Sequence, residues 1–392
     1  MNKSFASRLI HLGEKSPESV SRTKSLPISM SSVFVFDDVE TLDQIYDGEA
    51  KGYIYTRNGN PGHDALTEIM YNIEEGEDAL AYSSGMAAIS LSIISQVRAG
   101  DHIIAANVLY GGSFQFIKTE LARFNIDVTF VDPVNEDITP YFRANTKVVY
   151  IESISNPLME VIDIEKIAKL SHKHGAKLIV DNTFATPVIC QPLLLGADIV
   201  AYSATKYLCG HSDVTAGIVV SNKETIRQIY GVGLLYGPTM SPFDAWLLVR
   251  SLRTLELRII QHSNNALKLA VYLSGNPKIS EVYYPGLPTS PTFNTANRIF
   301  NNNLYGGMLS IDLSGGEKDA YELIRNLESI KFVPSLAGVS TSVSYPAKTS
   351  HRSLNAEELK KANISKGLIR ISTGLENIDD IIAEFEKALG KL

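Results

Sequence analysis

Two short apolar runs constrain the fold of this chain most, because each is followed directly by polar side chains. Residues 178–180 (LIV) precede Asp181, and residues 197–200 (ADIV) lead to a turn that carries Lys206. Short continuous apolar runs are typical of buried parallel strands, and ligands bind beyond the carboxyl ends of such strands. We therefore expect Asp181 and Lys206 to lie on the ligand side of one sheet.

The residues that follow the second run suit an anionic compound with a carbonyl group. Ser203 and Thr205 can donate hydrogen bonds to a phosphate, while Lys206 can form a Schiff base. Asp181 can pair with a protonated pyridine nitrogen, so this set meets the needs of pyridoxal phosphate. Each residue alone is a weak signal, since most lysines are exposed and an aspartate after a strand often caps a loop.

In combination these residues resemble a known family. Residues 181–187 (DNTFATP), residues 203–207 (SATKY) and the pair Gly210 and His211 are similar to motifs of the Cys/Met metabolism family of pyridoxal-phosphate enzymes. The resemblance extends over nearly the whole chain. It implies an α/β, aspartate-aminotransferase-like fold (fold type I of the pyridoxal-phosphate enzymes), and it adds Thr183 to the cofactor-binding residues.

A glycine turn before an apolar helix predicts the phosphate site. Residues 82–89 (YSSGMAAI) place Ser84, Gly85 and Met86 at the start of a helix, where free backbone amides can bind phosphate. Such turns are common, so the pattern is weak by itself. It closely resembles the phosphate-binding turn of the family.

A tyrosine and an arginine precede the first predicted helix. Asn60 followed by Pro61 predicts a helix start, and Tyr55 and Arg57 come just before it. Arginine binds phosphate well through two parallel charged hydrogen bonds, although a loop arginine is usually solvated. The resemblance implies that Tyr55 and Arg57 reach the cofactor phosphate of the neighbouring subunit. Gly62 stands where the family usually has threonine, so we expect a local change at the helix entry.

Two further candidates follow predicted strands. Tyr110 comes after residues 101–107 and before two glycines, so its ring is free to stack on a flat group or, alternatively, to pack in the core. Asn156 follows the strand of residues 148–152. The resemblance implies that Tyr110 stacks on the cofactor and carries protons to the leaving group. It also implies that Asn156 binds the phenolic oxygen of the cofactor and the substrate.

Arg370 lies within an otherwise apolar predicted strand, where an unpaired buried charge would be costly. We expect it to face an anion, and the resemblance implies that it binds the α-carboxylate of the substrate. Residues 334–346 resemble the specificity loop of the family, which includes the substrate-binding Ser335. Many members carry glutamate in place of Ser340 and histidine in place of Tyr345, so we expect a smaller and less charged substrate tail.

The order of the predicted elements indicates two domains. Strands and helices alternate through the first half, which predicts a mostly parallel sheet wrapped by helices in a large cofactor-binding domain over residues 60–255. A continuous helical pattern over residues 241–274 leads to a smaller α+β domain over residues 256–392. Residues 1–59 form a predicted N-terminal arm, which either lies on another subunit or packs as an irregular segment on its own domain.

Composition excludes several other classes of protein. The net charge of −7 disfavours a general nucleic-acid binder, and no apolar run approaches the roughly 20 residues that span a bilayer. The first residues lack the apolar core of a secretory signal. Cys190 and Cys209 are the two cysteines, and their spacing fits neither a metal site nor a redox pair. We expect a cytoplasmic protein without a metal.

The resemblance implies γ-elimination from a sulfur amino acid: methionine, cystathionine or homocysteine. Lys206 would act as base and Tyr110 as acid, and the products would be 2-oxobutanoate, ammonia and a thiol. Gly112 stands where dedicated methionine lyases commonly place cysteine, which weakens the methionine option.

Two alternatives remain for the activity. The same residues serve γ-replacement, in which an acylated homoserine condenses with cysteine, sulfide or methanethiol. A cofactor-binding protein without turnover is the other, but it would not need the set Tyr110, Lys206 and Arg370. The expected assembly is a homotetramer built of dimers with shared active sites.

Overall fold

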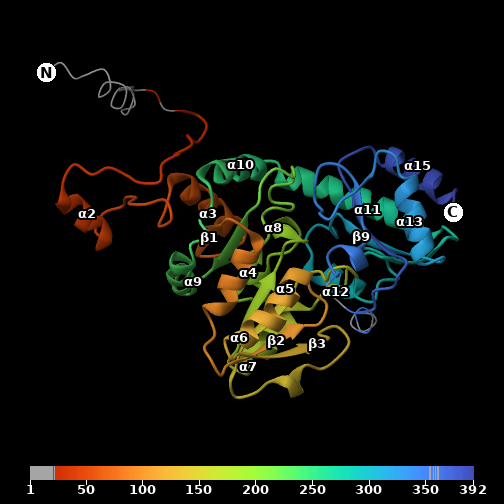
Figure 1. Ribbon diagram of the computed structural model, residues 1–392, viewed down its shortest axis with the longest axis horizontal. Helices are drawn as coiled ribbons and strands as arrows, with labels where there is room; N and C mark the ends of the chain where they lie inside the picture. Colours follow the sequence, from red (N-terminus) through yellow and green to blue (C-terminus); the bar gives the residue numbers. More distant parts are fainter. Residues whose placement is uncertain (1–20, 22, 353–354, 356, 358, 360–361) are drawn as a thin grey trace.

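The computed structural model describes residues 21, 23–352, 355, 357, 359 and 362–392, so residues 1–20 of the predicted arm lie outside the described residues. Figure 1 shows a central body, a segment that carries α2 (Val39–Tyr46) extending from one end, and the C-terminal elements at the other end. None of the helices in the described part of the chain combines the length and the apolar character that a bilayer span requires.

Within the described residues the larger sheet has seven strands in the order β1-β7-β6-β5-β4-β2-β3. Strands β6, β5, β4, β2 and β3 run parallel, and β7 is antiparallel to both of its neighbours. The central strands are continuously apolar and buried, as is typical of a sheet covered on both faces. In chain order the strands are β1 (Asp78–Tyr82), β2 (His102–Ala106), β3 (Asp127–Val131), β4 (Thr146–Glu152), β5 (Lys177–Asp181), β6 (Ile199–Tyr202) and β7 (Gly217–Ser221).

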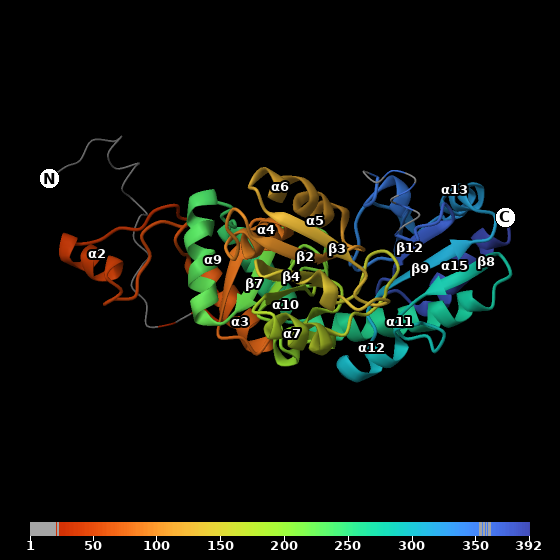
Figure 2. The ribbon, with the colours of Figure 1, turned by 90° about the horizontal axis from the view of Figure 1, so that it is seen from below.

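Helices cover both faces of this sheet. In Figure 2, α5 and α6 lie on one side of β2 and β3, and α7 lies on the other. The helix start predicted at Asn60 is found, because its side chain caps α3; Asp163 caps α7 in the same way. The helices and short turns are α3 (Pro61–Ile73), α4 (Gly85–Ile94), α5 (Gly111–Gln115), a π-helical turn (Phe116–Glu120), α6 (Leu121–Arg123), a 3₁₀ turn (Thr139–Tyr141), α7 (Ile164–Lys173), α8 (Thr186–Ile189), a second 3₁₀ turn (Pro192–Leu195), α9 (Lys223–Tyr236) and α10 (Pro242–Leu252).

A second, smaller sheet is formed by the C-terminal part of the chain. Counted over the described residues it has five strands, in the order β10-β11-β12-β9-β8. The arrangement matches the predicted α/β class with a smaller α+β unit, while the domain boundaries at residues 59 and 255 stay predictions. The remaining elements are α11 (Leu255–Ser274), β8 (Ile279–Tyr283), α12 (Phe293–Ile299), β9 (Met308–Leu313), α13 (Glu317–Asn326), β10 (Lys331–Phe332), β11 (Ser342–Ser344), a 3₁₀ turn (Pro346–Lys348), β12 (Leu368–Ser372) and α15 (Ile378–Leu389).

The continuous helix predicted over residues 241–274 is wrong in one respect, because the chain breaks between α10 and α11. The carbonyl of Ser251 accepts hydrogen bonds from the Thr254 hydroxyl (3.2 Å) and from the Arg258 guanidinium (3.0 Å). The backbone amide of Thr254 also donates to this carbonyl (3.2 Å), so an i to i+3 bond and two side chains take the place of the i to i+4 bond of a continuous helix. The pattern of apolar residues carries no signal for such a tertiary bond.

A buried carboxyl group lies under the carboxyl ends of β5 and β6. Glu74, at the end of α3, is fully buried and accepts a hydrogen bond from the Tyr202 hydroxyl. The Asn182 amide in turn donates to Tyr202 (2.9 Å). Among the described residues no cation pairs with Glu74, and burial holds its pKa well above the usual range.

This carboxyl group should make the stability of the protein depend on pH. The unfolded chain releases the proton of Glu74 near pH 4.5, whereas the folded chain retains it, so stability falls as the pH rises above 4.5. Glu74→Gln cannot lose a proton. It should raise the midpoint of thermal unfolding by about 2 °C or more at pH 8, and by progressively less toward pH 4.5.

Thermal scans of both proteins between pH 4.5 and 8 measure the difference. Glu68, exposed on the same helix, provides the matched control variant Glu68→Gln, which should follow the wild type. A Glu74→Gln protein that is less stable than the wild type at every pH would contradict a protonated, buried Glu74.

Candidate active site

All predicted site residues except Tyr55 and Arg57 line one cavity of about 520 Å³. It lies beyond the carboxyl ends of β4, β5 and β6, and the loop before β11 together with β12 of the smaller sheet forms its other wall. The predicted residues that the fold brings together are Ser84, Gly85, Met86, Tyr110, Asn156, Asp181, Thr183, Ser203, Thr205, Lys206, Ser335 and Arg370.

The start of α4 offers free backbone donors to an anion. The Ser84 side chain accepts from the amide of Ala87 (3.1 Å), and within the described residues the amides of Gly85 and Met86 make no hydrogen bond. A Cβ on Gly85 would lie 2.6 Å from Cβ of Ser203, so only glycine allows the two segments to approach this closely. These two amides and the nearby hydroxyls fit the phosphate of the predicted cofactor.

Lys206 lies in the turn after β6, with its Nζ donating to Oγ of Ser335 (3.1 Å). Burial, and then the charge of Arg370, lower the pKa of this lysine to about 8. A substantial fraction of the amine is therefore neutral near physiological pH, which both imine formation and proton abstraction require.

Two carboxyl groups lie side by side in the floor of the cavity. Glu152 on β4 is the register partner of Asp181 on β5, and Asp181 also accepts from the amide of Thr183 (2.9 Å). Burial raises the pKa of Asp181, while burial and the nearby Asp181 hold the pKa of Glu152 well above its usual range. Two adjacent buried carboxyls disfavour double ionisation, so the arrangement favours a single negative charge on the pair.

Tyr110 is held at the cavity by its backbone. Its amide donates to Oε1 of Glu152 (2.7 Å), and its side chain is half exposed. A Cβ at Gly112 would lie 2.6 Å from Cε1 of the Tyr110 ring, so a cysteine at this position would force the ring to move. The glycine found here therefore affects the placement of Tyr110 as well as the chemistry available at position 112.

Arg370 projects from β12 of the smaller sheet toward the larger one. Its guanidinium donates to Oδ1 of Asn156 (2.9 Å) and to the carbonyl of Ser335 (3.4 Å). Among the described residues no carboxylate pairs with this buried cation, and burial lowers its pKa to about 10. The guanidinium stays charged at neutral pH, so its arrangement fits an incoming carboxylate.

Tyr55 and Arg57 do not reach the cavity of their own chain. The Arg57 guanidinium donates to the carbonyl of Leu234 (2.9 Å) and lies 5.6 Å from the centre of the Tyr55 ring, which is largely exposed. Arg57 lines a different cavity, of about 300 Å³.

Several lining residues were not predicted, and two residues of the predicted specificity loop lie elsewhere. Ser340 and Tyr345 do not line the cavity; Ser340 is exposed, and the buried Tyr345 hydroxyl donates to the carbonyl of Lys366 (2.8 Å). The expected loss of charge near the substrate tail therefore does not follow from these two positions.

The lining residues that were missed include Phe184, Thr215, Leu336, Lys348, Thr349, Ser350 and Arg352. The sequence did carry one signal for these lining residues: two basic residues, Lys348 and Arg352, follow the predicted specificity loop of residues 334–346.

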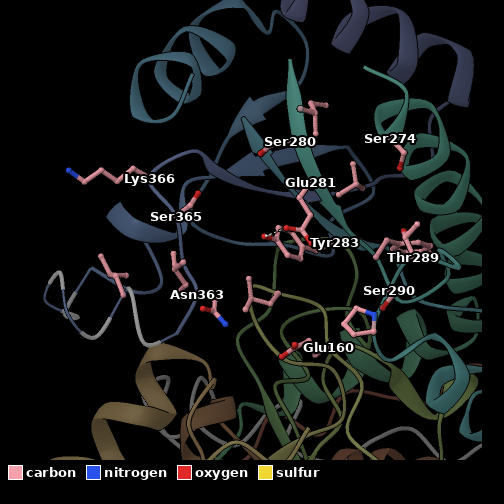
Figure 3. Close-up of a pocket in the computed structure, with 17 residues that line it drawn as sticks. Glu160, Ser274, Ser280, Glu281, Tyr283, Thr289, Ser290, Asn363, Ser365 and Lys366 are labelled. Carbon is pink, nitrogen blue, oxygen red and sulfur yellow. Dashed lines mark hydrogen bonds between the residues drawn. The ribbon is translucent and has the colours of Figure 1, made fainter. Parts of the chain in front are cut away.

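A larger cavity, of about 910 Å³, lies along β8 (Figure 3). Glu160, Glu281, Tyr283 and Lys366 line it, and Tyr283 donates to Glu281 (3.0 Å). None of the predicted site residues is among the described residues that line this cavity. Size alone therefore does not identify the site; the smaller cavity holds the reactive groups.

The site residues and the fold define a pyridoxal-phosphate-dependent enzyme, and comparison with known proteins gives the family. The family described as Cys/Met metabolism PLP-dependent enzyme matches residues 6–390. The chain belongs to this family, which confirms the predicted resemblance, fold class and cofactor.

Relatives and solved structures agree with this assignment. An L-methionine γ-lyase of Porphyromonas gingivalis is 42% identical, over 100% of this chain and 98% of that protein. A cystathionine β-lyase of Lactococcus lactis is 39% identical over 99% of each chain. The crystal structure of a putative O-acetylhomoserine (thiol)-lyase of Campylobacter jejuni, which holds a pyridoxyl-lysine phosphate, is 30% identical with a TM-score of 0.91, over 96% of this chain and 97% of that one.

The lowered pKa of Lys206 leads to a measurable prediction. In apoprotein of the purified enzyme, the rate of recombination with pyridoxal phosphate should rise with pH to a midpoint near 8, because the neutral amine attacks the carbonyl. Arg370→Gln should move the midpoint upward, since it removes a nearby positive charge.

Stopped-flow absorbance at a series of pH values gives the midpoint. The control is Arg325→Gln, which changes an exposed arginine on α13 and should leave the midpoint unchanged. A wild-type midpoint near the ordinary lysine value, or one that does not respond to Arg370→Gln, would contradict the proposed environment of Lys206.

Proposed function

We propose that this protein is a carbon–sulfur lyase that eliminates the γ-substituent of a sulfur amino acid to give 2-oxobutanoate, ammonia and a thiol. The observation that carries the proposal is a single cavity that joins Lys206, hydrogen-bonded to Ser335, with the unpaired Arg370 and the carboxylate of Asp181. These groups provide a base, a carboxylate-binding cation and an anion for the cofactor ring. The substrate is accordingly a free amino acid, that is, a small molecule with an α-carboxylate that Arg370 can bind.

Different residues around the cavity would bind different parts of the cofactor. When bound, pyridoxal phosphate supplies a carbonyl that condenses with amines and a ring that accepts the electron pair released at the α-carbon. The start of α4 and the hydroxyls of Ser203 and Thr205 would hold the phosphate. Asp181, oriented by Thr183, would keep the ring nitrogen protonated. Asn156 would bind the phenolic oxygen, and the ring of Tyr110 would cover one face.

The remaining groups would carry out the proton transfers. Arg370 fixes the α-carboxylate through a forked, charge-assisted hydrogen bond. Lys206 then accepts the α-proton at Nζ, and its lowered pKa suits a base at neutral pH. Lys206 would pass this proton on and then accept the proton that leaves the β-carbon, and the Tyr110 hydroxyl would donate a proton to the departing γ-substituent. Water would then be consumed in the release of 2-oxobutanoate and ammonia.

The same residues serve the alternative of γ-replacement. The choice between the two reactions depends on whether water or an added thiol reacts after the γ-substituent has left. The methionine option gains support from the 42% identity to an L-methionine γ-lyase, although Gly112 differs from the cysteine expected in dedicated methionine lyases. We favour elimination because the relatives that match this chain over nearly its whole length include an L-methionine γ-lyase and a cystathionine β-lyase.

We also propose the assembly, the domain division and the cellular location. Tyr55 and Arg57 point away from their own cavity, which supports an arm over residues 1–59 that completes the site of a neighbouring subunit. Dimers that share sites in this way would associate into a homotetramer. The large domain over residues 60–255 and the small one over residues 256–392 follow the two sheets. The net charge and the few cysteines suit the cytoplasm.

Direct assay separates the candidate activities. Purified protein is given methionine, cystathionine, or O-acetylhomoserine with cysteine, and 2-oxobutanoate and thioether are quantified. Elimination predicts 2-oxobutanoate and thiol from the first two, and Lys206→Ala should lower kcat by at least about 100-fold because the general base is lost. Thioether as the dominant product would favour replacement. Wild-type turnover by Lys206→Ala would contradict the role of this lysine.

Subunit mixing tests the shared site. Arg57→Ala and Lys206→Ala proteins, each inactive alone, should recover up to about a quarter of wild-type activity when mixed and allowed to exchange subunits. The reason is that half of the dimers are then mixed, and one of the two sites in each mixed dimer is intact. Mass spectrometry of differently labelled chains verifies exchange. Exchange without recovered activity would show that each site is built from one chain.

A further inference from the structure

Residues 347–352, which follow the predicted specificity loop, pack directly on the turn of Tyr110. A Cβ on Gly111 would lie 1.9 Å from the carbonyl oxygen of Ser350, so the glycine allows the two backbones to touch. The ring Nε2 of His351 also lies 3.2 Å from the carbonyl oxygen of Leu109. The segment is thereby fixed on the Tyr110 side of the cavity, where the γ-substituent is proposed to leave.

Two cations of this segment, Lys348 and Arg352, line the cavity, and among the described residues neither has a close ion-pair partner. The side chain of Lys348 is 58% exposed, and its Nζ lies 4.0 Å from a carboxylate oxygen of Glu317. Arg352 is exposed, and its guanidinium forms no ion pair with any residue that the structure describes. An exposed ion pair at that distance is weak, so both cations remain available to an anion from solution.

The other charges of the cavity do not neutralise this pair. Asp181 is assigned to the ring nitrogen, and burial and the nearby Asp181 raise the pKa of Glu152, which disfavours a second negative charge beside it. Arg370, on β12 of the smaller sheet, is itself a cation and is assigned to the α-carboxylate of the substrate. His351 adds no charge, because burial, and then Arg370, lower its pKa to about 4. The Tyr110 side of the cavity thus carries two cations beyond those that the α-carboxylate requires.

We infer that Lys348 and Arg352 form a subsite for a carboxylate at the far end of the γ-substituent. The inference rests on the proposed function and narrows its substrate class. The preferred substrates are amino acids whose γ-substituent ends in a carboxylate, such as cystathionine or a homoserine ester of a dicarboxylic acid, rather than methionine. This reverses the expectation of a less charged tail drawn from Ser340 and Tyr345, because different residues line this end.

Binding measurements test the subsite without turnover. 2-Aminoadipate carries a terminal carboxylate, whereas norleucine has an uncharged side chain of similar length, and neither offers a leaving group at the γ-carbon. Each is titrated into the cofactor-loaded enzyme, and the apparent Kd is read from the visible absorbance of the cofactor. The wild type should bind 2-aminoadipate about 10-fold more tightly than norleucine, and Lys348→Ala/Arg352→Ala should abolish the preference.

Kinetics on the proposed substrates give a second readout. Arg352→Ala should lower kcat/KM for cystathionine about 5- to 10-fold, mainly through KM, and change that for methionine less than 2-fold. Arg352→Lys should keep part of the preference, and Arg352→Glu should reverse it. Arg325→Ala, an exposed arginine on α13 that does not line the cavity, is the matched control and should change neither substrate.

The outcomes separate this inference from the proposed function. Turnover of methionine and cystathionine with the same relative efficiency in wild type and double variant would overturn the subsite and leave the lyase intact. No turnover of any sulfur amino acid would overturn the proposed function, while the titrations would still decide on the subsite. Equal affinity of the wild type for 2-aminoadipate and norleucine would also overturn the proposed subsite.

Discussion

The site depends on the register of three parallel strands. Glu152 on β4 lies opposite Asp181 on β5, and Asp181 lies opposite Ala201 on β6, so their carboxyl ends form one edge. Successive side chains of a strand alternate between faces, and a shift of one residue would turn Asp181 away from the cavity. The apolar residues before each of these positions are buried and hold the register by packing, which also fixes the start of the Lys206 turn.

Helix α11 makes hydrogen bonds to segments on both sides of the cavity. Near its start, Arg258 donates to the carbonyls that follow Lys206, at 2.7 and 3.3 Å. One turn later, Nδ1 of His262 lies 2.6 Å from the carbonyl oxygen of Thr373, just beyond Arg370 on β12. One helix therefore contacts both the turn of Lys206 in the larger unit and the residues that follow β12 in the smaller one.

Local sequence and the family resemblance together predicted most of the residues that line the cavity, because many of them follow apolar strands or begin helices. The turn of Ser84 and the residue Asp181 show this directly, since a strand end or a helix start fixes where the next side chain points. The prediction failed where a tertiary contact decides. The break before Thr254 comes from hydrogen bonds to Ser251, and the lining role of Arg352 comes from packing on the Tyr110 turn, which lies about 240 residues earlier in the chain.

By itself the sequence indicated the class of fold and the cofactor, through its strand ends, its helix caps and its family resemblance, and it proposed the residues that would bind the cofactor, because these signals are local properties of the chain. The tertiary structure decided which distant side chains share the cavity. It placed Ser335 and Arg370 beside Lys206, left Arg57 outside, and brought Lys348 into the cavity that Tyr110 also lines. The physical reason is that the pKa of a lysine and the charge facing a substrate depend on distance and burial, which only the packed chain defines.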